Sequence, residues 1–112
     1  MLFRSLRDAG AVADCVRRCR PEVVLHLAAQ ALVRPSYADP LATFATNVMG
    51  TAHLLDALRD APCLRAAVIV TTDKVYGESK NGEAFHEDAP LVARCPYSAS
   101  KIAAEQIGRA HV

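Results

Sequence analysis

Residues 66–77 read AAVIVTTDKVYG, and this stretch decides the fold. Its first half is a short run of small and β-branched apolar residues, typical of a parallel strand that is buried on both faces. The second half places polar side chains at the carboxyl end of that strand: Thr71, Thr72, Asp73, Lys74 and Tyr76. In open α/β sheets ligands bind at this edge, and hydroxyl, carboxylate and ammonium groups suit proton transfer. The stretch therefore predicts a buried strand that ends in a candidate active site.

The overall composition is that of one small globular domain of 112 residues. Thirteen basic and twelve acidic residues leave a formal net charge of +1, with neither sign in a long run. The apolar fraction is 52%, and no apolar segment is long enough to span a bilayer. The first ten residues lack the apolar run of a secretory signal. We therefore expect a cytoplasmic protein with neither a nucleic-acid nor a membrane partner.

Four cysteines occur, at positions 15, 19, 63 and 95. Cys15 and Cys19 are four residues apart on an expected helix, and the chain has neither a CxxC pair nor a histidine cluster typical of zinc. We therefore expect buried or half-buried free thiols that act as small apolar side chains, with no disulfide and no metal site.

Helix and strand signals alternate in the first part of the chain. Asp8 is a good N-cap for a first helix, which Pro21 ends. Residues 22–29, EVVLHLAA, indicate a second buried strand that runs into small side chains. A loop is expected over residues 30–38, because Pro35 disfavours a helix there.

Two further helices complete the pattern. One begins at Asp39 and Pro40 and runs to about residue 59; the other begins at Pro96 and runs to at least residue 106. The first is apolar around much of its circumference, so one side should pack on the sheet and the other could face a partner subunit. Gly50 within it predicts a close helix–sheet contact. Strands about 40 residues apart with helices between them predict βαβ units and a parallel α/β sheet.

Tyr97 and Lys101 lie on one face of the last expected helix, four residues apart. A tyrosine is a weak base because its pKa is about 10. A neighbouring ammonium group favours the phenolate and lowers that pKa, so the pair can act as a base near neutral pH.

Four segments in this order carry a family resemblance: HLAAQ (26–30), TNVMGTAHLLDA (46–57), VTTDKVYG (70–77) and YSASK (97–101). Together they resemble the extended short-chain dehydrogenases/reductases, which act on nucleotide sugars with tightly held NAD(P). The resemblance implies a Rossmann-like, doubly wound parallel sheet with NAD as the cofactor. Residues 1–106 would hold only its central and C-terminal βαβ units, without the phosphate-binding βα unit. The parent enzyme would be a homodimer that pairs through the helices over 40–59 and 96–106.

Within the family, the chain is most similar to the 4,6-dehydratases that convert CDP-glucose into CDP-4-keto-6-deoxyglucose. The resemblance implies that Tyr97 takes the proton of the sugar C4 hydroxyl while hydride passes to NAD. Lys101 would hold the nicotinamide ribose and tune Tyr97, and Thr72 would bind the C4 oxygen. Asp73 would protonate the C6 hydroxyl as it leaves. Lys74 is a further catalytic candidate, because the group that removes the C5 proton stays open.

The same resemblance implies further contacts. Asn47 matches a buried polar residue that ties strand to helix, and Arg34 is a candidate substrate contact. Cofactor contacts fall on Leu27, Ala28, Ala29, Thr46 and Thr71, in addition to Tyr97 and Lys101. Each position also has an ordinary structural interpretation: Thr72 as a strand end, Asp73 as a turn residue and Lys101 as a solvated helix lysine.

The chain also departs from the family pattern. It has no GxGxxG or GxxGxxG motif, and residues 107–112, IGRAHV, match one reading frame of a widely used sequencing adapter. We expect the natural sequence to stop near Gln106, with Met1–Arg4 as a candidate artificial start. Two alternatives stay open: a nucleotide-sugar 4-epimerase, which needs no acid at residue 73, and a truncated piece without catalytic activity.

Overall fold

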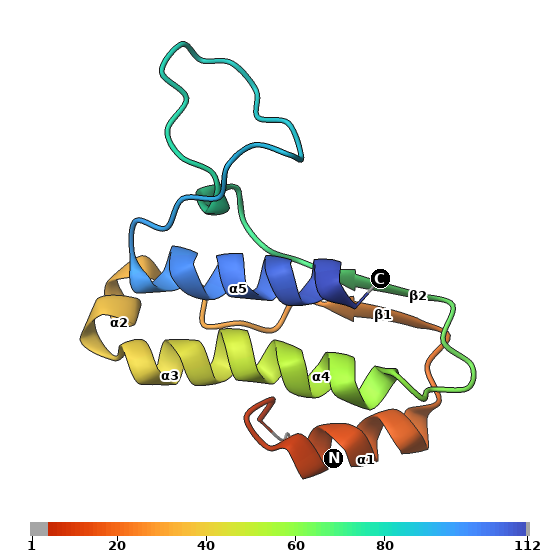
Figure 1. Ribbon diagram of the computed structural model, residues 1–112. Helices are drawn as coiled ribbons and strands as arrows, with labels where there is room; N and C mark the ends of the chain where they lie inside the picture. Colours follow the sequence, from red (N-terminus) through yellow and green to blue (C-terminus); the bar gives the residue numbers. More distant parts are fainter. Residues whose placement is uncertain (1–4, 112) are drawn as a thin grey trace.

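The computed structural model describes residues 5–111 (Figure 1). The expectations for Met1–Arg4 and for Val112 lie outside these described residues. Two parallel strands, β1 (Val23–His26) and β2 (Ala66–Ile69), form the sheet. The sheet places Val23 opposite Ala66 and His26 opposite Ile69. The expected α/β architecture with a parallel sheet is confirmed, although β1 is shorter than the expected strand over 22–29.

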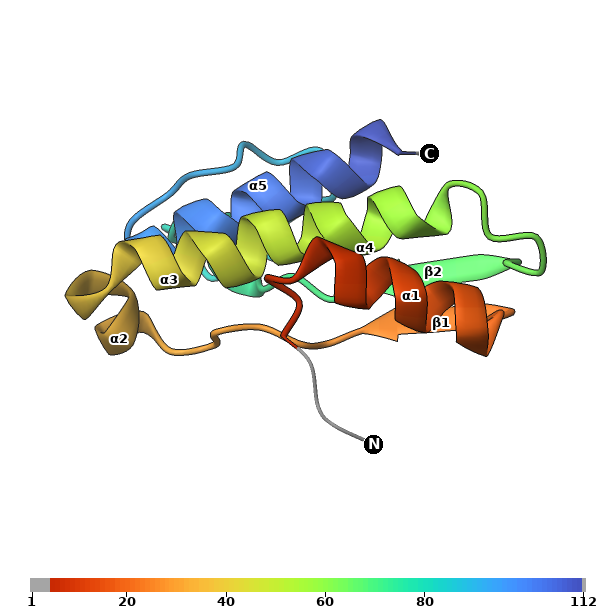
Figure 2. The ribbon, with the colours of Figure 1, turned by 90° about the horizontal axis from the view of Figure 1, so that it is seen from below.

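The helices that pack against this sheet lie on one face of it (Figures 1 and 2). The opposite face is open in the described residues, where Val23, Leu25 and Val68 are 51–66% exposed. The prediction that the β2 stretch is buried on both faces is therefore wrong for residues 5–111. The apolar sequence of the strand suits burial on both faces, whereas residues 5–111 cover only one of them.

Helix α1 (Ala9–Cys19) begins as expected, because the Asp8 carboxylate accepts a hydrogen bond from Ala11 N at 2.9 Å. Arg20 follows in the left-handed region with φ 47°, and Pro21 prevents the helix from continuing. Val12 of α1 packs against Leu54 and Leu58 in a small apolar core.

Helix α2 (Val33–Ala38) occupies the segment expected to be a loop. The prediction from Pro35 was wrong because Pro35 is the third residue of α2. The first four N–H groups of a helix have no intrahelical acceptor, so a proline there removes no hydrogen bond.

The expected long helix is continuous but has an irregular middle. Helix α3 (Pro40–Phe44) leads into a π-helical segment (Ala45–Met49) and then into α4 (Gly50–Leu58). As predicted, Asp39 caps its start by accepting from Ala42 N at 3.0 Å. A π-helical turn inserts one extra residue, which rotates the side chains that follow it and often marks a functional region.

Gly50 makes a close contact, but with a different partner from the expected sheet. A Cβ atom at Gly50 would lie 2.9 Å from Cβ of Leu6, in the turn before α1. The glycine therefore allows the N-terminal segment, rather than a strand, to approach the helix.

Gly50→Ala is expected to lower the free energy of unfolding by about 1 kcal/mol, despite the better helix propensity of alanine. The added methyl group meets the base of the Leu6 side chain, which cannot rotate away. Gly10→Ala is the matched control, because its Cβ would be 3.5 Å from the nearest atom, an ordinary contact. Urea denaturation of both variants measures the difference. Equal stabilisation by the two alanines would contradict the contact.

Helix α5 (Pro96–Ala110) begins at Pro96 as predicted and continues beyond Gln106. It packs against α2, α3, α4 and β2. Between β2 and α5 the chain makes a long excursion that projects away from the helices and strands (Figure 1). No helix within residues 5–111 combines the length and the apolar character needed to cross a membrane.

Candidate active site

The carboxyl end of β2 continues into a short 3-10 turn, Asp73–Val75. Val75 is 1% exposed and anchors this turn in the protein. The Thr72 hydroxyl donates to the Asp73 carboxylate at 3.2 Å and accepts from Lys74 N at 3.3 Å. The turn therefore brings the predicted residues Thr72 and Asp73 into direct contact, while the side chains of Asp73 and Lys74 face solvent.

The first turn of α5 holds Tyr97 in a buried position, with 7% of its surface exposed. Cys95 caps this helix and accepts from Ser98 N at 3.3 Å, and Ser98 Oγ accepts in return from Cys95 N at 3.1 Å. This reciprocal capping fixes the start of α5 and with it the position of Tyr97.

Lys101 lies one turn further along α5 and is only 6% exposed. Its Nζ donates to Val70 O, at the carboxyl end of β2, at 3.1 Å. Burial lowers the pKa of Lys101 from its ordinary value. The interpretation of Lys101 as a solvated helix lysine is therefore wrong. Because α5 also packs against the 3-10 turn, the lysine and Tyr97 belong to the same sheet edge as Thr72.

A buried amide holds this edge together. Asn47, in the π-helical segment, accepts from Gln30 N at 2.8 Å and donates to Gln30 O at 3.0 Å. Its amide also donates to Ser100 Oγ on α5 at 2.9 Å. Asn47 is buried as expected, but it ties the loop after β1, rather than the strand itself, to the long helix, and the structure adds α5 as a third element. The π-helical turn and α5 are thus linked through one side chain.

Asn47→Ala is expected to lower the free energy of unfolding by about 3 kcal/mol, because the half-buried backbone groups of Gln30 and the buried hydroxyl of Ser100 lose their partner. Asn81→Ala is the control: Asn81 is exposed in the long excursion, and its loss should cost less than about 0.5 kcal/mol. Chemical denaturation of both variants gives the comparison. A cost below about 1 kcal/mol at Asn47 would contradict a central role for this amide.

His26 is a site residue that sequence analysis did not single out. It is 5% exposed at the end of β1, and its Nε2 lies 3.0 Å from Thr51 Oγ1. Thr51 donates its own proton to Asn47 O at 2.7 Å, so Nε2 must be the donor to Thr51. Burial, and then the charge of Lys101, lowers the pKa of His26. A polar side chain at an inward strand position was the available signal.

This buried histidine predicts a pH dependence of stability. In the folded state His26 binds a proton less readily than in the unfolded state, in which its pKa has the ordinary value of 6.5. The free energy of unfolding therefore falls as the pH drops from 6.5 toward the lowered pKa. His26→Gln should weaken this fall between pH 7 and pH 5, measured by urea denaturation at each pH. An unchanged slope would contradict the burial of a neutral imidazole.

The other predicted residues take different positions. The Thr71 hydroxyl donates to Glu105 at 2.9 Å and so joins the segment after β2 to α5, while its contact with the cofactor stays a prediction. Leu27 and Ala28 are exposed after the end of β1. Ala29 and Thr46 are half-buried, and Arg34 is exposed on α2, outside the hydrogen-bonded network described above.

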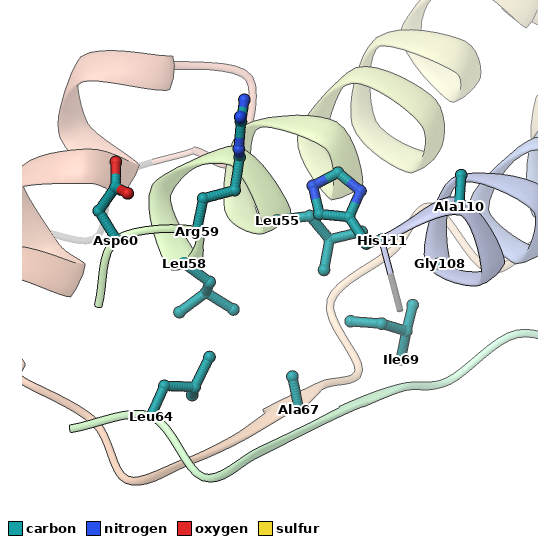
Figure 3. Close-up of a pocket in the computed structure, with 10 residues that line it drawn as sticks. All are labelled: Leu55, Leu58, Arg59, Asp60, Leu64, Ala67, Ile69, Gly108, Ala110 and His111. Carbon is teal, nitrogen blue, oxygen red and sulfur yellow. The ribbon is translucent and has the colours of Figure 1, made fainter. Parts of the chain in front are cut away.

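A cavity of about 720 Å³ lies between α4, α5 and β2 (Figure 3). Leu58 and Leu64 line one side, and Ala67, Ile69 and His111 contribute to the rest. None of the predicted site residues lines this cavity. The candidate active site is therefore the open sheet edge at the end of β2, and not this cavity.

Comparison with known proteins decides the family. A family model described as GDP-mannose 4,6 dehydratase matches residues 2–112. The chain belongs to this epimerase/dehydratase family. The resemblance seen in the sequence is thereby confirmed, together with the Rossmann-like fold.

The relatives of this chain include both 4,6-dehydratases and a 4-epimerase. It is 39% identical to the CDP-glucose 4,6-dehydratase of Salmonella typhimurium, over 94% of this chain and 29% of that protein. The structure of the dTDP-glucose 4,6-dehydratase DesIV from Streptomyces venezuelae, with NAD and TYD bound, has a TM-score of 0.86 at 35% identity; the match covers 96% of this chain and 32% of that one. The Thermus thermophilus UDP-glucose 4-epimerase, in complex with NAD, has a TM-score of 0.86 at 36% identity over 96% of this chain and 35% of that one. The chain thus spans about a third of the length of these relatives.

The described residues can accommodate the nicotinamide-ribose half of NAD. Lys101 has three ammonium donors, and among the described residues Val70 O is the protein acceptor that it reaches. Its remaining donors can hold ribose hydroxyls at the end of β2. The small side chains of Ala28 and Ala29 leave the backbone open to a flat ring after β1. The sequence has no glycine-rich loop for the diphosphate, so the fit is limited to the nicotinamide-ribose end.

Proposed function

We propose that this chain supplies the catalytic segment of an NAD-dependent nucleotide-sugar 4,6-dehydratase that converts CDP-glucose into its 4-keto-6-deoxy product. One observation carries the proposal: the Asp73 carboxylate accepts a hydrogen bond from the Thr72 hydroxyl on a turn that packs against α5. This places an acid beside the residue proposed to bind the sugar C4 oxygen. A dehydratase needs such an acid next to its oxidising site, because a hydroxyl leaves readily only when it is protonated.

Each residue has a part in this chemistry. Tyr97 in its phenolate form accepts the proton of the C4 hydroxyl and becomes a neutral phenol, and the charge of Lys101 stabilises the phenolate before the transfer. When substrate binds, the Thr72 hydroxyl gives up its hydrogen bond to Asp73 and forms one to the C4 oxygen of the sugar. Bound NAD would accept hydride from C4 and return it to C6. Asp73, in its protonated form, donates its proton to the C6 hydroxyl, which departs as water once the C4 ketone has made the C5 proton acidic.

Removal of the C5 proton requires a base, and Lys74 is the neighbouring candidate. A lysine removes a proton only in its neutral form, which burial favours. Lys74 is exposed in the free chain. We therefore propose that bound substrate must cover Lys74 if this residue is to act as the base.

The test is a hybrid enzyme in which residues 5–106 replace the matching segment of the Salmonella CDP-glucose 4,6-dehydratase. The hybrid supplies the glycine-rich region that this sequence lacks. Incubation with CDP-glucose should give a product that is lighter by one water molecule. An isomer of unchanged mass would instead support a 4-epimerase. A folded hybrid that binds NAD but converts nothing would contradict a catalytic role for this segment.

We also propose that the parent enzyme pairs with a second copy through the helices over 40–59 and 96–106. Leu41 and Met49 support this pairing, since they are 79% and 51% exposed on the long helix. Sedimentation equilibrium of the hybrid should give twice the mass of one chain. A monomer at micromolar concentration would contradict the pairing.

A further inference from the structure

Two thiols face each other on α1, away from the residues assigned to catalysis. Cys15 Sγ and Cys19 Sγ are 3.8 Å apart, one helical turn from each other. Cys15 is half-buried and Cys19 is exposed, so the expectation that all four thiols are at least half-buried is wrong for Cys19. Both thiols are free, and ions can reach them from solvent.

The surroundings of this pair separate it from the active site. Helix α1 packs on α4, whereas Tyr97 and Lys101 lie on α5, on the other side of α4 (Figure 2). The nearby Asp14 carboxylate is engaged by Arg17 and Arg18. A ligand at the two thiols would therefore leave the proposed catalytic residues unchanged.

The spacing of the sulfur atoms favours a bridging atom over a direct bond. Residues four apart on a helix have Cβ atoms about 5–6 Å from each other. A disulfide requires a Cβ–Cβ distance of about 3.8 Å, so oxidation would distort α1. Two zinc–sulfur bonds of about 2.3 Å at a tetrahedral angle span about 3.8 Å. The thiols already lie at that separation.

We propose that Cys15 and Cys19 form a two-thiolate site for one soft divalent metal ion of the zinc class. Binding forms two metal–sulfur bonds and releases two thiol protons to solvent, with no change of oxidation state. No group of three or more potential ligands occurs in residues 5–111, so water completes the coordination. Soft thiolates favour such ions over magnesium or calcium.

The experiment uses the reduced 112-residue chain and Cd²⁺ as the probe, which gives a thiolate-to-metal absorption band in the ultraviolet. One Cd²⁺ per chain is expected, with native mass spectrometry to confirm a one-to-one complex. Cys19→Ser should weaken binding by about tenfold or more. Circular dichroism checks that this exposed substitution leaves the helices intact. Cys63→Ser and Cys95→Ser are matched controls and should bind as the original chain does.

A second variant tests the spacing itself. Cys19→Ser combined with Arg17→Cys keeps two thiols on α1 but places them two residues apart, on different faces of the helix. It should bind Cd²⁺ as weakly as Cys19→Ser alone. Binding that survives in either variant, or two chains held by one ion, would overturn the proposal. These results are independent of any activity of the hybrid enzyme.

Discussion

Tyr97→Phe in the hybrid enzyme should lower the rate of CDP-glucose conversion by about 10²–10⁴-fold. The phenolate of Tyr97 is the proposed acceptor of the C4 hydroxyl proton, and phenylalanine keeps the ring while it removes that function. Tyr97 is 7% exposed, so the ring should continue to fill its place in the protein. The rate is measured from product formation under saturating substrate, with NAD binding followed separately.

Tyr76→Phe is the matched control for the loss of a phenol. The ring of Tyr76 stacks on Phe85 with a centroid distance of 5.2 Å, and the proposal gives its hydroxyl no chemical role. Its substitution should change the rate by less than about threefold, within the range of ordinary surface changes. Equal losses in the two variants would indicate a structural effect and remove Tyr97 from its proposed role.

The sequence predicted the parts of the fold that depend on local signals. Asp8 and Asp39 cap their helices as expected, and Pro96 begins α5. These features depend on a few neighbouring residues, which the sequence displays directly. The order of helices and strands likewise predicted a parallel sheet, because right-handed crossovers leave few alternatives.

Features that depend on distant contacts were not predicted. The π-helical segment is stabilised by Asn47, whose partners Gln30 and Ser100 are 17 and 53 residues away in the sequence. His26 hydrogen-bonds to Thr51, which is 25 residues away in the sequence. Gly50 was assigned to a sheet contact because sequence alone does not identify which segment approaches it.

For the candidate site too, the sequence predicted the contacts between neighbouring residues but not those that depend on packing. Thr72 and Asp73 share a turn, so their contact follows from adjacency. The burial of Lys101 against Val70 depends on how α5 packs, and periodicity alone allowed a solvated lysine. The Thr71 hydroxyl, next to Thr72, bonds to Glu105 on α5, as expected for alternating side chains that follow a strand.

Asp73→Asn should have the second large effect, and it separates two steps of the proposed reaction. The amide keeps the size of the carboxylate and can still accept a hydrogen bond from Thr72. It cannot protonate the C6 hydroxyl, so loss of water should slow by about 10²–10⁴-fold. Oxidation at C4 depends on Tyr97, Lys101 and Thr72 and should continue. Asp88→Asn, in the exposed excursion, is the control and should behave as the original hybrid.

The most direct test is a single-turnover reaction of the Asp73→Asn hybrid with CDP-glucose, in which reduced nicotinamide and dehydrated product are measured in the same sample. We expect reduced nicotinamide to accumulate while almost no dehydrated sugar forms. Dehydrated product at the rate of the original hybrid would contradict the assignment of Asp73 as the acid, and with it the distinction from a 4-epimerase.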